Sequence, residues 1–223
     1  MNTNSYLIDN SARSQEAEIW FALPPGFLAL PLLELAEAAS GPAEAARTGN
    51  VLLPLWEALP DPEARRRILN DFAPVQQMAK AFLESGAIHC SMGLHTDDEG
   101  DGGLLLSLFT VTWQAASWAP RKVIAARAAA GSERAEHIES LDLPCGPASL
   151  VQERLTVPPG PWLAQRELLQ VTAYVPCPDA VRVAVLTLAT AAVGRAQHYC
   201  ALLRDIAQTV TFDNPLPDVS DED

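Results

Sequence analysis

Hydrophobic positions recur with two different periods along this chain, which separates predicted strands from predicted helices. The period changes at residue 87, where a helical pattern gives way to two strand-like runs, 87–96 and 104–114. The acidic, glycine-rich segment 97–103 joins them and predicts a hairpin. Four more strand-like runs follow: 136–143, 148–157, 164–176 and 181–190. Their connections are short and rich in proline and glycine, which favours antiparallel neighbours.

Three segments have apolar residues at helical spacing. The first begins near Asp61 and continues to residue 82, with a kink or break expected at Pro74. The second, 120–130, predicts a short helix closed by a glycine, and the third, 195–209, predicts a helix laid on the core.

Together these elements predict an α+β fold, an antiparallel sheet of about six or seven strands flanked by helices. We expect one domain, residues 16–213, because 223 residues that are 48% hydrophobic supply one sizeable core. Residues 34–62 form an insertion rich in alanine, proline and leucine. The polar segment 1–15 and the acidic segment 214–223 are expected to be flexible tails.

Several short motifs accompany this order of elements: WFALPPGF at 20–27, LPCGPA at 143–148, QVTAYVP at 170–176, VAVLTLAT at 183–190 and DIAQTVTF at 205–212. In this order they resemble actinobacterial proteins of the PsbP-like and LpqN-like superfamily. The resemblance covers residues 18–213 and implies an α/β/α sandwich, from which the insertion at 34–62 departs. It implies binding: members include photosynthetic accessory subunits, envelope lipoproteins, regulators of small GTPases and adaptor chaperones of type VI secretion. It implies no site residues.

The net charge of the chain argues against polyanionic partners. Fifteen basic and 28 acidic residues give a formal net charge of -13, which repels nucleic acids and anionic lipids. No window approaches 18 apolar residues and the start lacks a basic region before an apolar run, so we expect a cytoplasmic protein without membrane contact. A protein partner or self-association is the expected interaction.

Candidate catalytic and metal-binding residues are few, and no cofactor is expected. Cys145 precedes a glycine in a turn and would have His137 as a base, although a buried structural cysteine explains the same pattern. His89 and His95 would share one face of a strand and could begin a metal site. The loop 97–103 resembles the start of a calcium loop but lacks the carboxylate at its twelfth position, so a solvated hairpin tip is expected.

Tryptophans offer the best indication of an interface. Trp113 and Trp118 flank a small segment beyond a strand, and Trp56 lies in the insertion. We therefore predict a non-catalytic protein-binding module of the adaptor or chaperone kind. Two alternatives remain: an immunity protein that neutralises a basic toxin, and a hydrolase that uses Cys145 or a metal held by His89 and His95.

Overall fold

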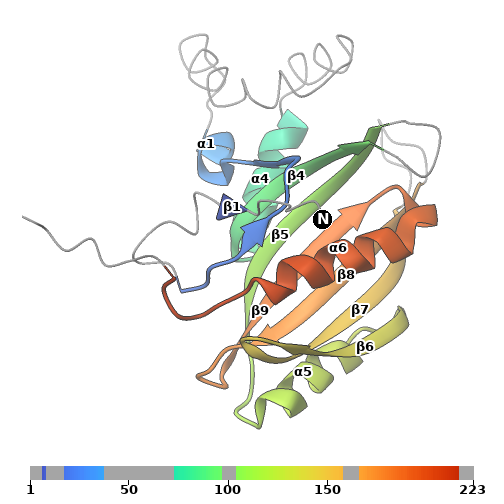
Figure 1. Ribbon diagram of the computed structural model, residues 1–223. Coiled ribbons are helices and arrows are strands. Elements are labelled where there is room, and N and C mark those ends of the chain that lie inside the picture. The colour runs from blue at the N-terminus through green and yellow to red at the C-terminus, as the bar shows by residue number, and fades with distance from the viewer. Residues whose placement is uncertain (1–6, 9–17, 38–72, 97–103, 158–165, 216–223) are drawn as a thin grey trace, which may run out of the picture. The chain divides into compact units, whose positions relative to one another are not determined.

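The computed structural model describes residues 7–8, 18–37, 73–96, 104–157 and 166–215 (Figure 1). Contacts between Cα atoms divide the chain into two compact units, residues 26–113 in one and residues 1–25 with 114–223 in the other. Most of the predicted N-terminal tail, the insertion beyond residue 37, the loop 97–103 and residues 216–223 lie outside the described part. The single domain over 16–213 stays a prediction.

The unit of residues 26–113 contains three antiparallel strands and two described helices. The strands are β3 (Phe27–Ala29), β4 (Ala87–Thr96) and β5 (Leu104–Ala115), and the helices are α1 (Leu32–Glu37) and α4 (Ala73–Glu84). Strand β4 pairs with β3 on one side and with β5 on the other.

Alternation along β4 gives this small sheet two different faces. Cys90 and Met92 belong to an apolar cluster with residues of α1 and α4, such as Leu35 and Ala79. The opposite face of β4 carries His89 and Ser91, both buried. Their neighbours across β5, by register, are Val111 and Phe109. One face therefore packs against helices, and the other carries buried polar, aromatic and aliphatic side chains.

The second unit is built on four antiparallel strands in the order β9, β8, β7, β6. Their bounds are Ala135–Leu143 for β6, Gly146–Val157 for β7, Arg166–Pro176 for β8 and Arg182–Thr190 for β9. The short strands β1 (Leu7–Ile8) and β2 (Ala22–Leu23) pair with each other. Trp20 also exchanges two backbone hydrogen bonds with Thr211, so the two ends of this unit are joined.

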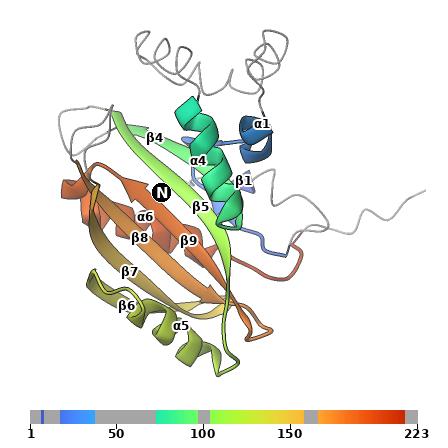
Figure 2. The ribbon, with the colours of Figure 1, turned by 180° about the vertical axis from the view of Figure 1, so that it is seen from behind.

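Helices lie on both faces of the four strands β6–β9. Helix α6 (Ala196–Gln208), preceded by the 3-10 turn Val193–Arg195, crosses one face, and α5 (Arg121–Ala130) lies on the other (Figures 1 and 2). Tyr199, Leu203 and Ile206 form the buried stripe of α6 and are fully enclosed. Helix α6 is held at β6 by an ion pair of 2.7 Å between Arg204 and Glu139.

The predicted fold class is confirmed: the fold is α+β, and strands β3 to β9 are antiparallel to the neighbours with which they pair within each unit. Strands β4 to β9 and the last two helices begin and end within about two residues of their predicted bounds. The prediction of a flexible tail over 1–15 is wrong at Leu7 and Ile8, because these two residues form β1 and pair with β2. Pro74 falls in the first turn of α4, where its missing N–H costs no helical hydrogen bond, so it does not kink the described helix. Among the described helices, none is long and apolar enough to cross a lipid bilayer.

Candidate functional site

The start of α5 is fixed to the ends of β7 and β8 by one arginine. Arg121 Nε donates a hydrogen bond of 2.9 Å to the carbonyl oxygen of Pro176 at the end of β8. The same side chain lies over Gly146, the first residue of β7, where a Cβ atom would come within 2.5 Å of Arg121 Nη1. Gly146 also has φ +127°, which favours glycine. Gly146 in the turn of the LPCGPA motif therefore leaves the space that the Arg121 side chain occupies.

A surface hollow of about 200 Å³ lies beside α5. Its floor is the small apolar cluster in which Ala119, Ile124 and Val183 are buried. The lining comes from the segment after β5, from α5 and from β9: Gln114, Ala115, Ala116, Ser117, Ile124, Arg127, Ala128 and Val183. None of these lining residues is acidic, and Arg127 is the one that carries a charge.

Trp118 directly follows the lining residues in the chain and is 76% exposed. A large aromatic side chain left in water is unusual on a surface that contacts nothing, and tryptophan is enriched at the centres of protein interfaces. Val123 of α5 and Val181 before β9 are further exposed apolar residues of this unit. We therefore take the hollow, Trp118 and the exposed side of α5 as the candidate site, and call it the α5 surface.

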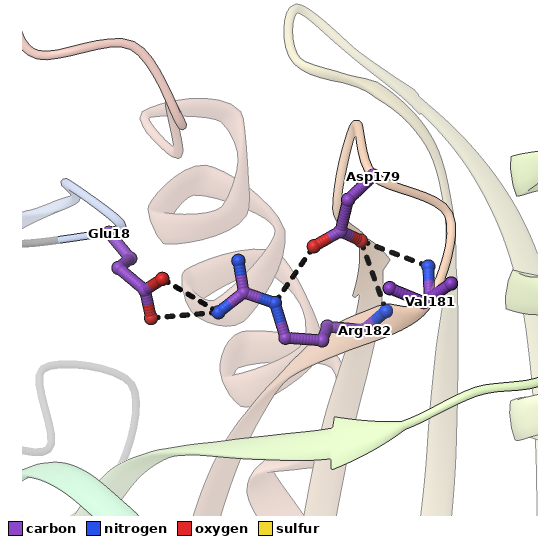
Figure 3. Close-up of polar contacts among 4 residues, drawn as sticks. All are labelled: Glu18, Asp179, Val181 and Arg182. Carbon is purple, nitrogen blue, oxygen red and sulfur yellow. Dashed lines mark hydrogen bonds and ion pairs between the residues drawn. The ribbon is translucent and has the colours of Figure 1, made fainter.

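The loop between β8 and β9 supports one wall of the hollow through a cluster of charged groups (Figure 3). Arg182 Nη1 lies 2.8 Å from both carboxylate oxygens of Glu18, and its Nε lies 2.8 Å from Asp179 Oδ2. Asp179 Oδ1 accepts hydrogen bonds from the backbone N–H groups of Val181 and Arg182 at 2.9 and 3.1 Å. The carbonyl oxygen of Val181 in turn accepts the N–H of Ala116, a lining residue, at 2.8 Å.

These contacts shift the pKa values of the charged groups in the expected directions. Hydrogen bonds to Glu18 and Asp179 raise the pKa of Arg182. Burial acts to raise the pKa of Asp179, but the hydrogen bonds from Val181 and Arg182 outweigh it and lower that pKa overall. Because its folded pKa is depressed, the charge of Asp179 stabilises the fold above its unfolded pKa, and this contribution is lost as the pH falls through the folded pKa.

Replacing Asp179 by asparagine should therefore weaken the fold at neutral pH and leave it unchanged in acid. Asparagine keeps an oxygen that accepts the two backbone N–H groups. The change therefore removes the charge and the hydrogen bond that Oδ2 accepts from Arg182 Nε. The expected loss at pH 7 is about 0.5 kcal/mol, because the pair is one-third exposed and screened by solvent. Urea unfolding between pH 7 and 2.5 measures it. Asp142→Asn, at an exposed position of β6, is the control, and a loss for Asp179→Asn that does not decrease between pH 7 and 2.5 would contradict the assignment to charge.

Cys145 lies at the β6–β7 turn and is partly buried. Burial raises the pKa of its thiol, and the nearby Arg121 guanidinium only partly opposes this, so the thiol is protonated at neutral pH and is a poor nucleophile. His137, the predicted base, is six residues from Leu143 along β6, a separation of about 20 Å in a strand. The two residues of the proposed hydrolase site are therefore not brought together.

The other three cysteines are buried, and all four are free thiols. Burial raises the pKa of Cys90 to about 12 and that of Cys177 to about 11. Cys200 also has a raised pKa from burial, and its thiol contacts Gln152 Oε1 at 3.5 Å. These thiols behave as small core side chains.

His89 and His95 share one face of β4, as predicted, but they are six residues apart. Six residues of a strand span about 20 Å, which is too far for two ligands of one metal ion. His89 lies beside Phe109, with ring centroids 5.8 Å apart, and His95 lies beside Phe27 at 5.2 Å. Within the part of the chain that the structure describes, no three His, Cys, Asp or Glu side chains gather as a metal site would need.

Of the predicted interface residues, Trp118 is 76% exposed and Trp113 in β5 is half-buried. Trp56 lies outside the described residues. Sequence reasoning missed Arg127, which lines the hollow, and Lys122, which lies on the same helix. A signal for both was present: the stretch 120–132 contains three basic residues and no acidic one, in a chain of net charge -13. It also missed Arg182, for which no local pattern exists.

Comparisons with protein-family models, with curated proteins and with solved structures found no match.

Proposed function

We propose that this chain is a non-catalytic protein-binding module of the adaptor or chaperone kind, and that the α5 surface is its contact surface. The observation that carries the proposal is Trp118, which is 76% exposed and directly follows the residues that line a hollow. The position is held by Arg121 at the start of α5 and by the Arg182 cluster under the β8–β9 loop. A rigid scaffold that presents an exposed aromatic anchor is the arrangement expected of a binding site.

The sequence supports the same proposal. The resemblance to the PsbP-like and LpqN-like superfamily implies binding. We propose a cytoplasmic location together with the adaptor role. The hydrolase alternative loses its support from geometry, because Cys145 is separated from His137 and His89 from His95. The immunity alternative requires an acidic contact surface for a basic toxin, and the α5 surface carries cations instead.

Trp118→Ala should remove a stoichiometric partner that co-purifies with the tagged chain from its native host. Loss of a central tryptophan anchor typically weakens binding at least tenfold. The free energy of unfolding should change by less than about 0.5 kcal/mol, because the side chain is three-quarters exposed. Partner recovery by quantitative mass spectrometry and the mass of the purified chain by light scattering measure both forms of association.

Ile138→Ala provides a matched control. Ile138 is also an exposed apolar residue, 48% exposed, but it lies on β6, away from the lining of the hollow. The control should keep the partner. A chain that is strictly monomeric and recovers no stoichiometric partner would overturn the proposed function, and equal losses in the two variants would move the contact surface away from Trp118.

A further inference from the structure

The side of α5 that faces away from the sheet carries apolar residues between two cations, although packing of the fold does not need apolar residues there. At 100° per residue, Val123, Ala126 and Ala130 fall on the outer side of the helix, with Lys122 at one edge and Arg127 at the other. The inner side carries Ile124, Ala125 and Ala129, which are buried against the sheet. The outer face is thus an apolar strip between two cations, and no described element covers Val123, which is 39% exposed.

Lys122 and Arg127 do not stabilise the described fold through polar contacts. Arg121 is bound to the carbonyl oxygen of Pro176, but Lys122 and Arg127 make no ion pair or hydrogen bond with any described residue. Three other described arginines of this unit form ion pairs: Arg182 with Glu18 and Asp179, and Arg154 and Arg204 each with a glutamate of β6. Solvated cations are common, but here they border an exposed apolar strip in a chain of net charge -13.

We infer that the α5 surface binds an acidic amphipathic segment of a partner protein, with its apolar side on Trp118 and Val123 and its carboxylates beside Lys122 and Arg127. This inference rests on the proposed function and names the chemistry of the partner. Charge complementarity selects this occupant: the bordering groups are cations and none of the hollow's lining residues is acidic. Nucleic acids and anionic membranes fit poorly, because they carry far more negative charge than two cations can offset against the repulsion of the whole chain, whereas an amphipathic segment brings only a few carboxylates.

The net charge of the chain makes the test sharp. The probes are two fluorescein-labelled amphipathic 18-residue peptides built from leucine, alanine and either glutamate or lysine, titrated with the full chain and followed by fluorescence anisotropy. General electrostatic attraction to a protein of charge -13 favours the lysine peptide. We expect the glutamate peptide to bind at least tenfold more tightly, a result that only a local cationic surface explains.

Single substitutions locate the binding. Trp118→Ala, Lys122→Glu and Arg127→Glu should each weaken binding of the glutamate peptide fivefold or more. Lys80→Glu makes the same charge change at an exposed position of α4 and should alter it less than twofold. Circular dichroism checks that each variant folds, and Arg127→Lys should retain most of the affinity, which separates charge from a change in the helix.

Other outcomes overturn the inference. Equal or tighter binding of the lysine peptide, equal effects of Lys80→Glu and Arg127→Glu, or no binding of either peptide would each do so. Binding that appears only when Asp218, Asp221, Glu222 and Asp223 are changed to amides would identify the chain's own tail, in place of a partner, as the occupant. If the peptides fail while a partner sensitive to Trp118→Ala still co-purifies, the proposed function stands and only the partner's chemistry is wrong.

Discussion

Replacing Leu203 by alanine is expected to lower the free energy of unfolding by about 2–5 kcal/mol. Leu203 has no exposed surface and belongs to the stripe of α6 that lies on the sheet. The strands beneath this helix carry fully buried side chains on the same face, among them Val171 and Leu188, which the register of β8 and β9 places opposite each other. Removing the Leu203 side chain leaves a cavity. Val171 and Leu188 cannot fill this cavity unless the backbone of their strands moves.

The matched control is the next residue in the helix. Leu202→Ala makes the same chemical change with the same gain in helix propensity, but Leu202 is only half-buried. Its expected loss is about 1 kcal/mol or less. Urea unfolding followed by far-ultraviolet circular dichroism compares the two variants. Similar losses at both positions would contradict the assignment of Leu203 to the core.

The Leu203→Ala variant also tests the predicted single domain, by hydrogen exchange. If residues 16–213 unfold together, Leu203→Ala lowers protection against hydrogen exchange in β4 and in β8 by the same free energy. If β4 keeps its protection while β8 loses it, the two compact units unfold separately, and the prediction of one domain is wrong. The outcome does not depend on how the α5 surface functions.

Periodicity predicted the sheet strands well for a physical reason. A strand with one face buried alternates strictly, and a slip of one residue would turn its apolar set to water, so pattern and structure must agree. Helix α6 obeys the same logic with a period of 3.6. Short apolar runs such as 27–33 follow neither period, because they are too short to distinguish a strand from a helix. The structure divides the run 27–33 at Pro31, with β3 ending at Ala29 and α1 beginning at Leu32.

The candidate site was predictable only in part. Trp118 was identified because tryptophan is rare and informative wherever it occurs. The groups that hold the site in place meet across the chain: Arg182 and Glu18 are 164 residues apart in sequence, and Arg121 and Pro176 are 55 apart. No local pattern encodes such pairs. The separation of His89 from His95 was, in contrast, calculable from the strand rise alone.

Gly93→Ala is expected to destabilise the chain by about 1–3 kcal/mol, since it adds a methyl group where no space exists. Gly93 of β4 faces Ser107 of β5 and Phe27 of β3. A Cβ atom at Gly93 would overlap Ser107 Oγ and would lie 2.9 Å from His95 Nε2 and 3.0 Å from Phe27 Cε1. Real Cβ contacts are longer, so these side chains would have to move.

Ser107→Ala turns this prediction into a double-mutant cycle. The Ser107 hydroxyl is buried and has no hydrogen-bond partner among the described residues, so its removal alone should cost less than about 0.5 kcal/mol or stabilise the chain. In the Ser107→Ala background Gly93→Ala should cost less than in the wild type, with an interaction energy of about 0.5–2 kcal/mol. Gly194→Ala is the control, because nothing lies within 4 Å of a Cβ atom there. Additive effects of the two substitutions in urea unfolding would show that His95 and Phe27, and not the serine hydroxyl, enforce glycine at this position.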